Sequence, residues 1–220
     1  MKKGFTLIEM IIVVAIITIL CGVVFLSSLS TLKTAKVEGF SNEALSLIRR
    51  LYDTQLSEGK FIDQVGTKVS GKYNLASTYN ILFESEDDDG NNITGITAVL
   101  RNKESVIDRV ALSNITSIKD LTLTLDEVIQ EGNETTQNTM YPREDDGTVD
   151  EYMITFDSRG RILRALDDDL DDYDDYEEIQ EVKTLKNLSI KMSITDKIER
   201  IININTPPSG NIVLEKRGSQ

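Results

Sequence analysis

The sequence predicts an α+β protein in which one long N-terminal helix packs on an antiparallel β-sheet, or on a domain of two such sheets. An uncharged apolar run from Met10 to Leu26 has further apolar residues on both sides, so it exceeds the roughly 20 residues that a membrane-spanning helix needs. Apolar residues then recur at helical spacing as far as Leu51. Beyond Gly59, short alternating or apolar runs are separated by Gly, Asp and Asn, which is typical of antiparallel strands.

The first element begins with the stretch KKGFTLIE, in which Glu9 is an acid at the edge of the apolar run. A carboxylate inside a membrane span costs about 2.5 to 3.5 kcal/mol near the centre, so its presence points to a function and to a partner. A secretory signal fits poorly, because Glu9 interrupts the apolar region and no A-x-A-like cleavage site follows. A lipoprotein signal ending at Cys21 has Leu20 where a small residue is expected.

The same stretch resembles the class III signal of type IV pilins and pseudopilins, since a short basic leader ends in a glycine that is followed by FTLIE. The resemblance implies that a prepilin peptidase cuts after Gly4 and that the new amine of Phe5 is methylated. It makes Glu9 an assembly residue that pairs with this amine on a neighbouring subunit. A Glu9 side chain that only reaches to the membrane surface is the alternative.

The orientation of the span is left open by the flanking lysines, since Lys2 and Lys3 precede it while Lys33 and Lys36 follow it. The resemblance implies a single pass through the cytoplasmic (inner) membrane with an exterior C-terminus, followed by entry into a pilus or pseudopilus. Its implied partners are the prepilin peptidase, other pilin or pseudopilin subunits and membrane lipid.

The helix is expected to continue out of the membrane as an amphipathic element. Apolar residues at positions 37, 40, 44, 48 and 51 lie three and four apart, which places them on one helical face. Gly22 and Gly39 are weak points inside the helix, and Gly59 is a plausible stop. We therefore divide the chain into a leader (1–4), a transmembrane helix segment (5–30), an amphipathic continuation (31–58) and a β-rich globular domain with acidic loops (59–220).

The globular part offers nine candidate strands, of which we expect one or two not to form: 79–84, 95–102, 106–112, 121–128, 152–158, 161–166, 188–194, 199–205 and 211–216. Glycine-containing segments at 157–161 and 206–211 predict hairpin turns. The order of these last strands and turns is similar to the C-terminal half of the GspH and FimT group of minor pseudopilins. The first proline is Pro142, so the helix lacks the proline of many major pilins, which favours a minor subunit.

Composition limits the chemistry that the chain can perform. The 24 basic and 37 acidic residues give a net charge of -13, which argues against nucleic acid as a partner. Histidine is absent, which removes Ser-His-Asp catalysis and His-ligated metal sites. We expect no enzymatic activity and no cofactor.

Acidic clusters at 84–92, 143–151 and 166–181 fall between predicted strands. Such blocks normally form solvated loops, because their charges repel one another. The alternative is a calcium site at DDDGNN, where Asp87, Asp89 and Asn91 alternate around a turn-forming glycine. No glutamate follows at the interval that an EF-hand requires, so we favour the solvated loop.

Two functions follow from the sequence. The first is a minor pilin or pseudopilin, a structural subunit of a type IV pilus, a type II secretion filament or a competence filament. The alternative is a monomeric membrane-anchored exterior module that binds a ligand or calcium. Glu9 separates them, because a simple anchor gains nothing from a carboxylate in its span.

Overall fold

A computed structural model describes residues 7–65, 68–69, 72–73, 78–87, 93–102, 105–142, 148–166, 180–195, 198–206 and 212–218. The chain forms two compact units, Met1–Lys36 and Val37–Gln220. Helix α1 (Leu7–Glu58) contributes to both units. The second unit contains the rest of α1, the short helix α2 (Ile62–Val65), a 3-10 turn η2 (Ile115–Ser117) and all the strands. The α+β class predicted from the sequence is confirmed.

Helix α1 ends where the sequence predicts. Its last residue is Glu58, and Gly59 follows with a φ of 65°, the left-handed conformation in which glycine commonly terminates a helix. Gly22 and Gly39 lie inside the helix without interrupting it. The residues before Leu7, where we expected the helix to begin, lie outside the described part of the chain.

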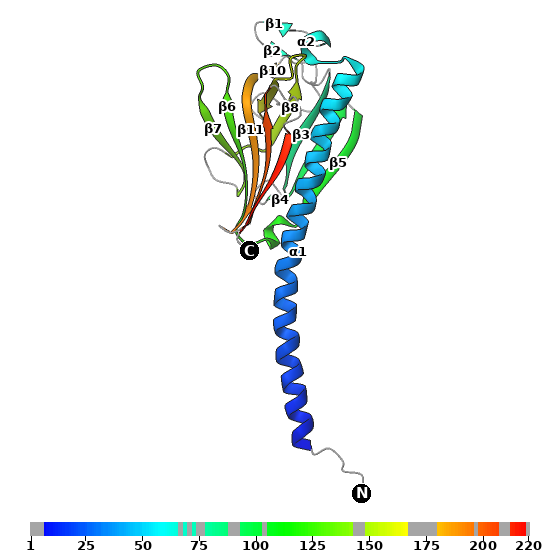
Figure 1. The fold of residues 1–220 in the computed structure, drawn as a ribbon, viewed down its shortest axis with the longest axis vertical. Coiled ribbons are helices and arrows are strands. Elements are labelled where there is room, and N and C mark those ends of the chain that lie inside the picture. Colours follow the sequence, from blue (N-terminus) through cyan, green and yellow to red (C-terminus); the bar gives the residue numbers. More distant parts are fainter. Residues whose placement is uncertain are drawn as a thin grey trace. The chain divides into compact units, whose positions relative to one another are not determined.

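Ten strands form one large sheet (Figure 1). Eight of them follow the order β13-β12-β11-β9-β8-β3-β4-β5, while β6 pairs with β11 and β7 pairs with β6. Their bounds are β3 Tyr79–Asp87, β4 Ile93–Asn102, β5 Ser105–Ser113, β6 Leu121–Ile129, β7 Thr135–Tyr141, β8 Glu151–Phe156, β9 Ile162–Leu166, β11 Lys183–Ile194, β12 Ile198–Asn205 and β13 Ile212–Gly218. A small second sheet joins β1 (Lys68–Val69), β2 (Lys72–Tyr73) and β10 (Gln180–Glu181).

Strand β11 holds the large sheet together because it pairs with three strands. It runs antiparallel to β12, to β6 and, through its first three residues, to β9. The two predicted hairpins are confirmed by the antiparallel pairing of β8 with β9 and of β12 with β13. The residues at 207–211, between β12 and β13, lie outside the described part of the chain.

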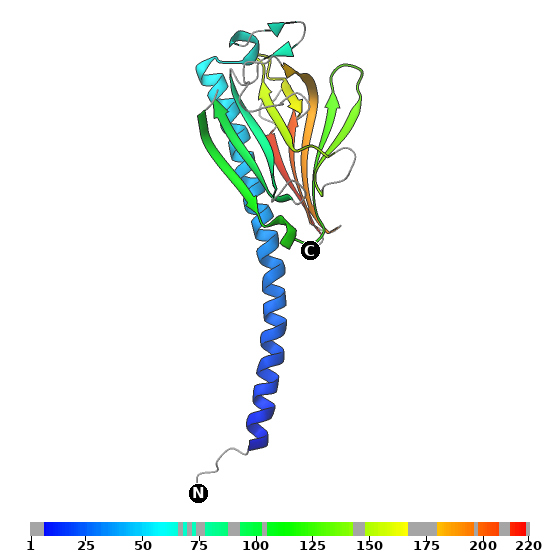
Figure 2. The same cartoon turned by 180° about the vertical axis from the view of Figure 1, so that it is seen from behind.

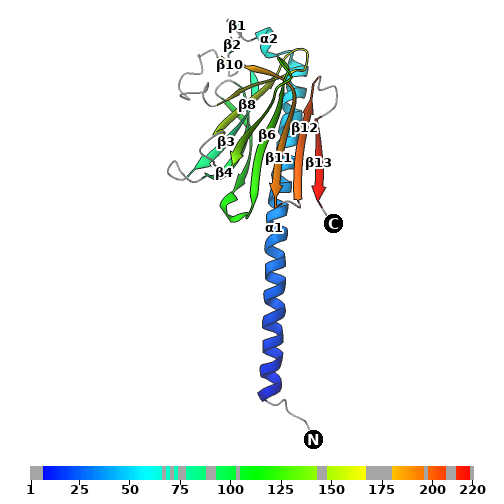
Figure 3. The same ribbon diagram turned by 90° about the vertical axis from the view of Figure 1, so that its left-hand side faces the viewer.

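The sheet curves around the second half of α1, and β5 and β13, the two ends of its eight-strand path, reach the helix (Figures 2 and 3). Arg50 forms an ion pair of 2.7 Å with Asp108 on β5, and the Arg49 guanidinium donates to the Ile212 carbonyl on β13 at 2.8 Å. The predicted stripe of α1 lies in the core that the sheet encloses: Val37, Phe40, Ala44, Ile48 and Leu51 are all buried. Burial of this stripe attaches the helix to the sheet.

Each of the nine candidate strands corresponds to a strand, so our expectation that one or two would not form is wrong. Strand β7 was missed, because its sequence TTQNTMY contains only Met140 and Tyr141 as apolar residues. It forms because β6 offers it a partner edge along most of its length, and backbone pairing does not require apolar side chains on both faces.

Candidate functional site: the apolar segment of α1 and its anchor in the sheet

The first part of α1 carries an exposed apolar surface. Large apolar side chains from Leu7 to Leu32 are exposed, including Leu7 at 78% and Ile19 at 67%. By length and composition α1 is the one helix among the described residues that could cross a membrane, although a signal sequence near an N-terminus meets the same criterion. Exposed apolar area on this scale is unfavourable in water, so the segment requires lipid or other apolar helices around it.

Polar groups in this segment are arranged to suit an apolar environment. The Thr18 hydroxyl donates to the Val14 carbonyl one turn earlier, at 2.8 Å, so its proton needs no water. Glu9 lies in the first turn of α1, where the partial positive charge of the helix N-terminus favours a carboxylate. The Glu9 side chain is exposed.

The structure locates only part of the site that the sequence predicts. Glu9 lies on α1, whereas Gly4 and Phe5 lie outside the described residues. Of the calcium candidates, Asp87 is the last residue of β3, and Asp89 and Asn91 fall outside the described part. Within the residues that the structure describes, no cluster of three or more acidic or cysteine side chains is placed to hold a metal ion.

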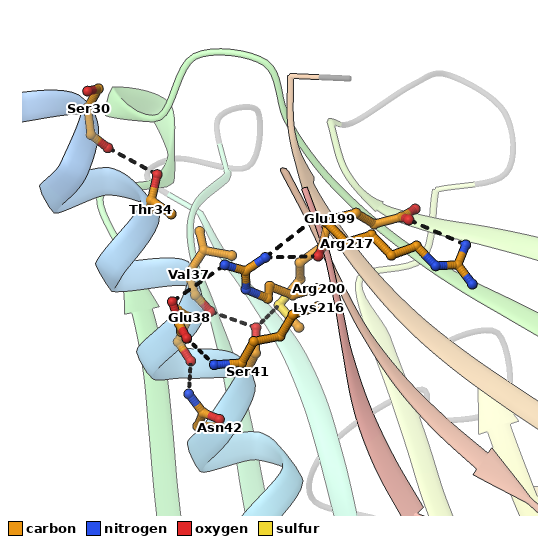
Figure 4. A network of polar contacts seen from close by, with 11 residues as sticks. Ser30, Thr34, Val37, Glu38, Ser41, Asn42, Glu199, Arg200, Lys216 and Arg217 are labelled. Atoms are coloured by element: carbon orange, nitrogen blue, oxygen red, sulfur yellow. Dashed lines mark hydrogen bonds and ion pairs between the residues drawn. The ribbon is translucent and has the colours of Figure 1, made fainter. Parts of the chain in front are cut away.

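An ionic cluster anchors α1 to the last two strands (Figure 4). The Glu38 carboxylate accepts from the Arg200 guanidinium on β12 at 3.4 Å and forms an ion pair with Lys216 on β13. One helical turn on, the Ser41 hydroxyl is bonded to the Val37 carbonyl at 2.6 Å and lies 3.4 Å from the Met192 sulfur on β11. Residues far apart in the sequence therefore fix the start of the packed half of the helix.

The electrostatics of this cluster favour ionised Glu38. Its hydrogen bond to Lys216, together with the charges of Lys216 and Arg200, lowers the pKa of the Glu38 carboxyl despite partial burial. At the far end of α1, Glu58 accepts from Tyr79 at 3.0 Å and pairs with Lys60 at 2.8 Å. The hydrogen bond from Lys60 has the largest effect in lowering the pKa of the Glu58 carboxyl, and the hydrogen bond from Tyr79 lowers this pKa further. Both ends of the packed half of the helix are thus tied to the domain by carboxylates.

Buried polar residues between these ends were missed by the sequence analysis. Gln55 is fully buried, and its amide donates to the Thr155 hydroxyl at 3.0 Å and to the Tyr79 carbonyl at 3.3 Å. Its position one helical turn after Leu51 extends the apolar stripe, so helical periodicity is the signal that could have found it.

A second buried group lies within the sheet. Glu127 on β6 is fully buried and is bound by Arg164 on β9 and by Tyr152 on β8. Every second residue of β6 is buried, and Glu127 continues the series begun by Leu121, Leu123 and Leu125. The alternation therefore indicated an inward-facing carboxylate, which must be paired to be tolerated.

Comparison with known proteins gives one match. The family model of the prokaryotic N-terminal methylation motif matches residues 1–25. No curated protein and no solved structure matches the chain. The motif together with the apolar segment of α1 fits a single-pass, membrane-anchored, type IV pilin-like protein. The chain therefore carries, at its N-terminus, the class III signal of a type IV pilin-like protein.

Proposed function

We propose that this chain is a minor pilin or pseudopilin, a structural subunit without enzymatic activity that assembles into a type IV pilus, a type II secretion filament or a competence filament. The observation that carries the proposal is the methylation motif at residues 1–25. It overlaps the start of helix α1, whose first part exposes apolar side chains and whose second part buries its stripe in a β domain. Such a helix leaves one segment available to other subunits.

Processing makes the subunit competent for assembly. The precursor is inserted in the cytoplasmic membrane with its C-terminus outside, and a prepilin peptidase cuts after Gly4. Glycine suits the cut because a residue without a side chain lets a catalytic site approach the backbone. Methylation of the new amine leaves Phe5 with a positive charge at the depth of Glu9.

Glu9 acts as the assembly residue by pairing with this amine on the adjoining subunit. At a separation of about 4 Å and an effective dielectric constant of about 20, the attraction is about 4 kcal/mol. This is comparable with the cost of about 2.5 to 3.5 kcal/mol for placing a carboxylate in a membrane span. Desolvation of both charges offsets part of the gain, so pairing makes the carboxylate tolerable and favours the register in which the two charges meet.

The subtype is supported by the end of the chain. The β8–β9 hairpin and the final β12–β13 hairpin follow the order that suggested the GspH and FimT group. The absence of proline before Pro142 favours a minor subunit over a major one.

The test is the exchange of Glu9 for alanine in the native host, compared with Met10→Ala, which truncates the neighbouring exposed side chain without removing a charge. We expect Glu9→Ala to be inserted and cleaved, since it removes a charge from an apolar segment, but to be lost from sheared filaments or from crosslinked subunit ladders. Met10→Ala is expected to assemble. Normal assembly of Glu9→Ala would contradict the proposal and would favour a monomeric anchored module.

A further inference from the structure

A basic pocket lies on the β domain of this strongly acidic chain. It has a volume of about 480 Å³ and is lined by Gln130, Asn133, Arg159, Arg161, Lys186 and Thr206. Of the six lining residues that the structure describes, three are cations and none is an acid, although the whole chain carries a net charge of -13. Such a concentration of positive charge runs against the composition and calls for an anionic ligand.

Strand pairing brings the cations together. Leu185 on β11 pairs with Ile162 on β9, so Lys186 and Arg161, which neighbour these two residues in the chain, meet at the same place. The backbone N–H of Gln130 donates to the Thr184 carbonyl at 2.9 Å, and the backbone N–H of Thr206 donates to the Lys186 carbonyl at 3.1 Å. Backbone hydrogen bonds therefore hold the lining segments in a fixed arrangement.

The β8–β9 turn carries both arginines and is held by hydrogen bonds to Asp157. The Asp157 carboxylate is buried and accepts from the Arg159 amide at 3.0 Å, the Arg161 amide at 2.7 Å and the Arg161 Nε at 2.6 Å. Gly160 completes the turn with a φ of 73°, and its amide donates to the Asp157 carbonyl at 2.8 Å. Asp157 therefore neutralises one arginine charge, which leaves about two net positive charges from the three cations.

The acids near these cations are bound to other groups or lie outside the described lining of the pocket. The Asp63 carboxylate accepts from the backbone amide and the hydroxyl of Ser158, the residue before Arg159, and does not line the pocket. Among the described residues, the side chains of Arg159 and Lys186 form no ion pair. Glu131 and Glu134 belong to the adjacent β6–β7 turn but do not line the pocket, and the Glu134 side chain lies against Gly132. The side chains of Arg159 and Lys186 are thus available to a ligand.

We infer that this pocket binds a compact oxyanion with two or more negative charges, such as a phosphate group or a small polycarboxylate. Arginine guanidinium groups present planar forks that suit phosphate and carboxylate oxygens, and lysine adds a point charge. The volume suits a small ligand. A long polyanion would extend beyond the pocket and would be repelled by the net negative charge of the rest of the chain. The inference does not depend on filament assembly.

The experiment is isothermal titration of the full chain in non-ionic detergent with inorganic phosphate, citrate and acetate, at pH 7 and constant ionic strength. We expect saturable 1:1 binding of phosphate or citrate and none of the monovalent acetate. Binding of phosphate would identify phosphomonoesters as the ligand class, whereas binding of citrate alone would identify clustered carboxylates.

Two variants and one control locate the site. Arg159→Gln and Lys186→Gln are each expected to weaken binding about tenfold, because each removes a charged donor. Lys119→Gln removes the same charge from an exposed turn that does not line the pocket and should leave the affinity within about twofold, the level of diffuse screening. Circular dichroism establishes that each variant is folded. Failure to saturate with either anion, or equal weakening by Lys119→Gln, would overturn the inference.

Discussion

The buried carboxylate of Glu127 gives the sharpest test of how the sheet is held together. Arg164 Nε lies 3.0 Å from Glu127 Oε1 and 3.2 Å from Oε2, and the Tyr152 hydroxyl donates to Oε1 at 2.7 Å. The side chains of Glu127 and Arg164 are 0% and 4% exposed. Burial, together with the charge of Glu127, raises the pKa of Tyr152 well above its usual range, so the phenol stays a donor.

Glu127→Gln removes the negative charge and leaves the Arg164 guanidinium buried without a counter-charge. Breaking a buried pair from one side costs about 3 to 5 kcal/mol. The free energy of unfolding of an ordinary domain is about 5 to 15 kcal/mol in total, so this one substitution removes a large part of that free energy. The control is Asp126→Asn on the same strand, where the neighbouring carboxylate pairs with Lys191 at a partly exposed position. It should cost at most about 1 kcal/mol.

Replacing Glu127, Arg164 and Tyr152 together should lower the free energy of unfolding much less than replacing one of them. In Glu127→Leu with Arg164→Met and Tyr152→Phe, no charge or phenol hydroxyl remains unpaired, and apolar replacements of buried pairs are often neutral or stabilising. The assay is urea unfolding of the full chain in non-ionic detergent, followed by fluorescence of its 7 tyrosines in the absence of tryptophan. A loss below about 1 kcal/mol for Glu127→Gln, or a triple variant as unstable as the summed single variants, would refute the reasoning.

Two further predictions concern Glu38 and the calcium candidates. The pKa of Glu38 is lowered in the folded state, so its contribution to the free energy of unfolding is present above pH 4.5, the usual pKa of the group, and is lost as the pH falls through the lowered pKa. Glu38→Gln should therefore destabilise the chain at pH 7 by up to about 1 kcal/mol and by less in acid. The exposed Glu43→Gln on the same helix serves as the control in the same urea titration, and a Glu38→Gln effect that does not vary with pH would count against this assignment. Calcium should produce no specific rise in the melting temperature over chelator at matched ionic strength, since the acidic loops lack ordered ligand spacing. A rise that disappears in Asp87→Ala with Asp89→Ala would reveal a calcium site.

Much of the fold could be predicted because it rests on local periodicity. The stripe from Val37 to Leu51 repeats every three or four residues, and a helix must place such residues on one face. The alternation in β6 marks its buried face in the same way. Strand β7 has no comparable pattern, and its existence depends on the edge of β6, which the sequence alone does not display.

The polar contacts could not be predicted because their members are distant in the sequence. Glu38 meets Lys216 because β13 lies beside α1, and Glu127 meets Arg164 because β6 and β9 both pair with β11. The basic pocket likewise collects cations from the β8–β9 turn and from β11. The processing signal was predictable for the opposite reason, since the motif is contained in the first 25 residues.

The most direct test of the central claim is the chemical identity of the mature N-terminus. The chain is purified from the membranes of its native host and its N-terminal peptide is sequenced by mass spectrometry. We expect the peptide to begin at Phe5 with a methylated amine and to lack Lys2 and Lys3. A mature chain that begins at Met1, at Cys21 or near Thr31 would contradict the assignment as a type IV pilin-like subunit.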